Sequence, residues 1–215
     1  MEKRPDTGGP VCNLWTPALA KTPAYMADSS HLLLLSFLVI AQGFLHFPEH
    51  IAQVIQLFYL GAAPNGIVGR LNLEWVHVVY NWGLLIAMVP LMVGCGFFAR
   101  GNAWRRYNFV AWLAICSSFW IQVWHAFEHY GKLAQYVRNL AVTPAVIPPD
   151  GPNAPGLVGQ WILEAWGYGA SVVILHFTVN LIVFLPLVYA WLAYDVPGAI
   201  AARLRGEELS LRPAR

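Results

Sequence analysis

Four long apolar stretches, separated by polar or proline-rich connections, dominate the sequence. They cover residues 32–60, 71–98 and 108–137, and the fourth lies within 160–194. Each is long enough to supply the ~20 residues with which a helix crosses the hydrocarbon core of a bilayer. The pattern therefore predicts an all-α membrane protein whose core is a bundle of four transmembrane helices.

Prolines mark the interruptions of this pattern. Pro48 falls inside the first stretch and predicts a kink there, because proline removes a backbone donor. Prolines recur over residues 143–156, which predicts a non-helical connection, and Pro197 ends the last apolar stretch. The expected organisation is a polar tail at 1–29, a transmembrane domain at 30–197 and a charged tail at 198–215.

Composition agrees with a membrane protein. Hydrophobic residues make up 58% of the chain and charged residues only 11%, whereas soluble domains carry about 25% charged residues. The net charge of +2, without a basic cluster, argues against a nucleic-acid partner. The three cysteines form no C-x-x-C motif, so no disulfide framework is expected. The lipid bilayer is the expected partner.

The basic residues predict an orientation. With four spans, the two tails and the middle connection share one side of the membrane, and most of the lysines and arginines lie there. The positive-inside rule then places both termini in the cytoplasm. The residues on this side are Lys3, Arg4, Lys21, Arg100, Arg105, Arg106, Arg203, Arg205, Arg212 and Arg215.

Two short motifs occur twice, in the same order, inside the apolar stretches. H-x-x-E-H is present at His46–His50 and at His125–His129, and H-x-x-x-N is present at His77–Asn81 and at His176–Asn180. Six of the seven histidines belong to this pattern. The order predicts an internal repeat, in which two helical hairpins of the same kind form the bundle.

Helical geometry predicts that the motif residues converge. At ~100° per residue the polar residues of each motif share one face. At ~1.5 Å per residue all four motifs lie roughly 25–35 Å from the cytoplasmic end. A charged side chain in hydrocarbon is a candidate for function, and bundles build metal sites from facing helices. The predicted metal ligands are His46, Glu49, His50, His77, His125, Glu128, His129 and His176. The residues predicted to orient them are Gln53, Asn81 and Asn180, and Glu74, one turn before His77, is a further candidate.

The first hypothesis for function is a membrane oxidoreductase with two divalent metal ions, acting on a lipid-soluble substrate or dioxygen. Iron is favoured, and zinc and copper stay possible because imidazole suits all three. Glu49 and Glu128 are expected to be ligands, bridges or catalytic groups. The alternatives are a zinc hydrolase with one of these glutamates as general base, a haem-binding electron carrier, and a metal transporter or sensor.

Three resemblances accompany this hypothesis. H-x-x-E-H is similar to the motif of inverzincin peptidases, over five residues only. The histidine-rich site resembles in kind the di-iron sites of membrane desaturases and hydroxylases, although their H-x-x-H-H and H-x-x-x-H boxes are absent here. The combination of motifs over roughly residues 30–195 resembles a family of small bacterial four-span proteins. That resemblance implies the architecture and a bacterial cytoplasmic membrane, and it does not imply a reaction.

Overall fold

The structure, a computed structural model, describes residues 29–67, 74–94, 108–142, 156–166 and 170–206. Within these ranges four helices are long and apolar enough to cross a membrane, which confirms the predicted fold class. The candidate spans are Leu33–Phe58, Glu74–Val93, Phe109–Arg138 and Val172–Ala193. The elements are α1 (Ser29–Ile40), the π-helix η2 (Ala41–His46), α2 (Phe47–Phe58), α3 (Glu74–Gly94), α5 (Phe109–Val142), α6 (Leu157–Trp166), α7 (Ala170–Ala193) and α8 (Val196–Leu204).

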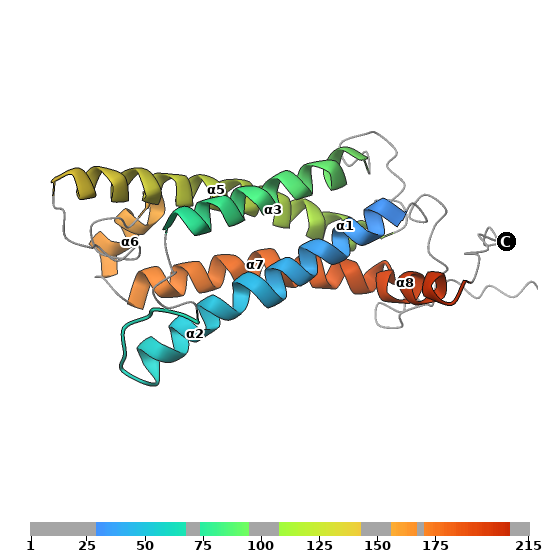
Figure 1. Ribbon diagram of the computed structural model, residues 1–215, viewed down its shortest axis with the longest axis horizontal. Coiled ribbons are helices and arrows are strands. Elements are labelled where there is room, and N and C mark those ends of the chain that lie inside the picture. The colour runs from blue at the N-terminus through green and yellow to red at the C-terminus, as the bar shows by residue number, and fades with distance from the viewer. Residues whose placement is uncertain (1–28, 68–73, 95–107, 143–155, 167–169, 207–215) are drawn as a thin grey trace, which may run out of the picture.

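The long helices lie side by side along the long axis of the molecule (Figure 1). Helix α5 packs against α3 and α7, while α1 and α2 pack against α7. The short helix α6 lies against α5 and α7 at the end of the bundle where α2 terminates, and α8 contacts α1 and α7 at the opposite end. The chain therefore enters α1 and leaves α8 at the same end.

The interior of the bundle is divided along its length. Near α8 it is apolar and fully buried, with Leu38, Met88, Ile115 and Leu187 at its centre. Near α6 the buried side chains are instead polar, and they include the histidines of the four motifs. Large apolar side chains such as Ile86, 65% exposed, cover the outside. An apolar exterior around a partly polar interior is the distribution expected for a bundle surrounded by lipid.

The first span is interrupted just before Pro48, as the sequence predicts. The interruption takes the form of the π-helix η2, and Pro48 lies in the first turn of α2 that follows. Proline cannot donate a hydrogen bond to the carbonyl four residues earlier. In η2 the backbone hydrogen bonds instead join residues five apart, so each helical turn is wider than in an α-helix. Gly43 in η2 lies against the ring of Phe184 in α7, where an added Cβ would come within 2.8 Å of the ring. The glycine permits this close approach of the two helices.

The end of the last span differs from the expected boundary at Pro197. The chain turns at Asp195, whose φ is 49°, and then forms α8 with Val196 and Ala199 buried. Pro197 lies in the first turn of this helix, where a backbone N–H would have no partner within the helix, so proline is tolerated there. The packed domain thus extends to Leu204. The tail at 1–28, most of the proline-rich connection and most of the basic residues used for orientation lie outside the described residues.

Candidate metal centre

All six motif histidines are buried inside the bundle, and their rings form one continuous cluster. None is more than 8% exposed. They come from η2 and α2, α3, α5 and α7, so each of the four spans contributes. The members of this six-histidine cluster are His46, His50, His77, His125, His129 and His176. The structure thus brings together the six histidines of the predicted ligand set, and their role as ligands stays a prediction.

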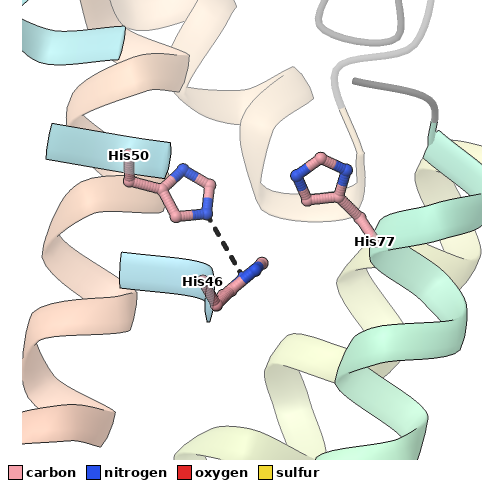
Figure 2. Close-up of side chains that lie close together, drawn as sticks. All are labelled: His46, His50 and His77. Atoms are coloured by element: carbon pink, nitrogen blue, oxygen red, sulfur yellow. Dashed lines mark hydrogen bonds between the residues drawn. The ribbon is translucent and has the colours of Figure 1, made fainter. Parts of the chain in front are cut away.

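One half of the cluster brings three histidines close enough together to hold a metal ion. His46 and His50 lie on successive turns, and His77 faces them from α3 (Figure 2). The Nε2 atoms of His46 and His50 are 3.3 Å apart, and the nearest ligand atoms of all three residues lie within 4.8 Å of one another. Two imidazole nitrogens bound to one tetrahedral ion at 2.0–2.1 Å would be about 3.3–3.4 Å apart. This first group could therefore hold a metal ion.

The other half, formed by His125, His129 and His176, has comparable ring distances, although among the described residues only the first group brings its ligand atoms close enough together to hold an ion. Its two motif histidines have centroids 4.6 Å apart, against 4.8 Å in the first group. Its third histidine lies 6.1 and 5.2 Å from them, against 5.6 and 6.0 Å. The two groups touch through stacked His77 and His129 at 5.4 Å, and through His50 and His176 at 5.8 Å. The cluster is thus two similar three-histidine groups in contact.

Each group has a histidine whose Nδ1 bonds to a buried oxygen. In the first group the Gln53 amide oxygen is 2.8 Å from Nδ1 of His50, which supports the predicted orienting role of Gln53. In the second group a carboxylate oxygen of Glu74, on α3, is 2.6 Å from Nδ1 of His129. Metal-binding histidines usually bond in this way through the nitrogen that is not a ligand.

Lys132 is the residue that sequence reasoning missed at this site. Its Nζ lies 3.4 Å from the second oxygen of Glu74, and both side chains are almost fully buried. Lys132 occupies in the second H-x-x-E-H motif the position that Gln53 occupies in the first. A lysine inside an apolar span was the available signal, because such a charge requires a partner.

Asparagines and glutamines link the two halves beneath the histidines. Asn81 and Asn180 each donate to the backbone carbonyl of the histidine four residues earlier, at 2.9 Å in both cases. Gln122 Nε2 donates to Asn81 Oδ1 at 3.0 Å, and Gln42 Nε2 donates to Asn180 Oδ1 at 2.7 Å. Both glutamines therefore connect a motif helix of one half to a motif helix of the other. The two asparagines thus connect the helices that carry the histidines.

The two motif glutamates bond to the backbone of the connecting segments. Glu49 accepts the Ile67 N–H at 2.7 Å. Glu128 accepts the N–H groups of Val158, at 2.9 and 3.0 Å, and of Gly159, at 3.1 Å, at the start of α6. Carboxylates are stabilised by such amides at a helix N-terminus. The roles of Glu49 and Glu128 as ligands or catalytic groups stay predictions.

A glutamine seven residues after each motif glutamate completes this attachment. Gln56 accepts from the N–H of Gly66 at 2.7 Å and donates to its carbonyl at 3.0 Å. Gln135 bonds to Gly156 in the same way, at 2.8 and 3.2 Å. Both glycines have positive φ, 70° and 89°, and both lie so close to a glutamate carboxylate that no Cβ would fit. Each connecting segment is therefore held on its helix by one glutamate and one glutamine side chain, which bond to the backbone at and beside a glycine.

Other buried polar atoms also face the cluster. The ring of Tyr80 stacks on His46, with centroids 4.4 Å apart. Among the residues that the structure describes, the Tyr80 hydroxyl and Nδ1 of His125 have no hydrogen-bond partner. Buried polar atoms normally have a partner, so a ligand at the cluster would account for them.

Comparisons of the chain with protein-family models, with characterised proteins and with solved structures found no match. The interpretation of the cluster therefore rests on its geometry and its chemistry.

Proposed function

We propose that the protein is an integral membrane metalloprotein in which the six-histidine cluster holds two metal ions, one for each three-histidine group. The observation that carries this proposal is the convergence of six buried imidazoles from four spans. Burying six imidazoles costs free energy unless their ring nitrogens have partners, and metal ions would supply such partners. Neutral imidazoles offer nitrogen lone pairs to which a metal cation can bind.

We further propose that the centre is redox-active and that the protein is an oxidoreductase. Most of the donors at the cluster are imidazoles, which suit iron and copper as well as zinc. Two adjacent redox-active ions could each exchange one electron, so that together they carry out a two-electron oxidation or reduction of one substrate. The substrate would be lipid-soluble, or dioxygen, because the cluster lies within a bundle surrounded by lipid. A zinc hydrolase is the second candidate, and in it Glu49 or Glu128 would have to exchange a loop amide for the metal-bound water.

The matched contacts of the two halves support an origin by duplication. The attachment of each connecting segment, the asparagine–glutamine bond and the ring contacts all recur with equivalent residues. Since α1 begins where α8 ends, we place both ends of the described chain on the same side of a bacterial cytoplasmic membrane. The basic residues of the sequence make this the cytoplasmic side.

Elemental analysis of the protein purified in detergent tests the proposal. We expect about two metal ions per chain from the ligand count, and about one after the triple change of His46, His50 and His77 to alanine. His31→Ala, outside the motifs, is the matched control and should lose none. Visible and electron paramagnetic resonance spectra then separate iron or copper from colourless zinc, and a Soret band would indicate haem. Retention of all metal by the triple variant would contradict the proposal.

A further inference from the structure

The two three-histidine groups have different surroundings, although their ring centroids are at comparable distances. Behind His50 lies a neutral amide, Gln53. Behind His129 lies the carboxylate of Glu74, which is paired with Lys132. This inference concerns that difference, and it rests on the proposed function.

We propose that Glu74 is a positioning residue for the metal ion of the second group, and that Lys132 is its counter-ion. A carboxylate accepts hydrogen bonds, so the 2.6 Å contact places the proton of His129 on Nδ1. The lone pair available to a metal is then on Nε2. Carboxylate–histidine–metal arrangements of this kind orient the ring and strengthen the ligand.

The geometry of α3 links this role to the first group. Glu74 precedes His77 by three residues, so both project from the same side of the helix. His77 belongs to the first group, whereas Glu74 bonds to His129 of the second, and the rings of these two histidines stack at an interplanar angle of 14°. One turn of α3 therefore supplies a ligand to one group and an orienting oxygen to the other.

Burial explains why the second group has two charged residues where the first has one amide. Side-chain exposure is 1% for Glu74 and 0% for Lys132. A carboxylate at this depth needs an opposite charge, and Lys132 supplies it at the position equivalent to Gln53. The residue equivalent to Glu74, three before His176, is Val173, which is buried and apolar. Each group thus has one hydrogen-bond acceptor for a motif histidine. In the first group the acceptor lies on the same helix as the histidine, and in the second group it lies on α3, opposite the histidine of α5.

This correspondence defines a transplant experiment. Glu74→Val combined with Lys132→Gln gives the second group the surroundings of the first, with an amide in place of the ion pair. Glu74→Val combined with Lys132→Met has nearly the same shape but offers no acceptor to His129. Both variants remove the two charges together, so neither leaves a buried charge without its partner.

The measurement is titration of metal-depleted protein in detergent with Co²⁺, whose absorption reports coordination, alongside circular dichroism to verify folding. We expect the Met variant to bind one of two Co²⁺ ions about 10–100-fold more weakly, the usual effect of losing such a partner. The Gln variant should recover most of that affinity. Gln53→Met should weaken the other ion instead.

Two results would overturn the inference. If both double variants bind two ions as the unmodified protein does, the acceptor at His129 has no role. If both are equally weakened, the charges or the packing control the site, and the hydrogen bond to His129 does not. Failure of the unmodified protein to bind Co²⁺ at all would instead contradict the proposed metal centre, so the two failures are distinguishable.

Discussion

Replacing Gly156 by alanine should destabilise the bundle much more than the same change at another glycine with positive φ. At Gly156, φ is 89°, and a new Cβ would overlap the Glu128 carboxylate and come within 2.8 Å of Lys132 Cγ. At Gly61, φ is 59° and no atom lies within 4 Å of the Cβ position. The two glycines thus share the backbone strain and differ in what surrounds them.

The expected magnitudes follow from this difference. A left-handed conformation costs an alanine about 1–2 kcal/mol, which is the whole effect expected for Gly61→Ala. At Gly156 the displaced carboxylate also loses bonds to Val158 and Gly159, and hydrogen bonds to charged groups contribute about 1.5–3 kcal/mol each. Gly156→Ala should therefore cost about 4–8 kcal/mol, which is the strain plus the loss of two such bonds. Gly66→Ala, in the other half, should behave like Gly156→Ala.

Thermal unfolding in detergent, followed by circular dichroism, measures these effects. A double-mutant cycle identifies the cause: in a Glu128→Ala background, Gly156→Ala should cost only the strain, about 1–2 kcal/mol, because the side chain it displaces is gone. Equal destabilisation by Gly156→Ala and Gly61→Ala would refute the reasoning. So would a cost at Gly156 that is unchanged by removing Glu128.

Two further predictions concern packing and the links between halves. Ile115→Ala, in the fully buried apolar core, should lower the stability by about 2–4 kcal/mol because it leaves a cavity. Ile86→Ala, on the outer surface, should lower it by less than ~1 kcal/mol. Equal melting temperatures for the two variants would contradict the assignment of inside and outside. Gln122→Leu should lower stability by about 1–3 kcal/mol because it removes the donor to buried Asn81, and an unchanged melting temperature would show that this bond does not hold the two halves together.

Helix geometry made the cluster predictable from the sequence. The rise and rotation per residue are nearly constant along an α-helix, so counting from the ends of the apolar stretches placed the histidines at one level and on inward faces. This reasoning needs no knowledge of which helices are neighbours. It therefore succeeded for His46, His77, His125 and His176, which come from four different spans.

The directions of the glutamates depend on information that a single helix does not contain. Glu49 shares the face of its two histidines, yet its carboxylate extends to Ile67 in the connecting segment. That choice depends on where the chain returns after α2, which periodicity does not report. The same holds for Glu74, since its bond to His129 exists only because α3 packs against α5. Loop return and helix pairing are the parts of the site that sequence patterns leave open.

The π-helix has a consequence for how the length of the first span can vary. Gln42 precedes His46 by four residues, whereas Gln122 precedes His125 by three, although the two glutamines make equivalent bonds. In a regular helix one extra residue would turn everything beyond it by about 100° and direct the histidines away from the interior of the bundle. The wide turn of η2 accommodates that residue. A residue can therefore be added or removed between α1 and α2 at η2 while the histidines of α2 keep their direction.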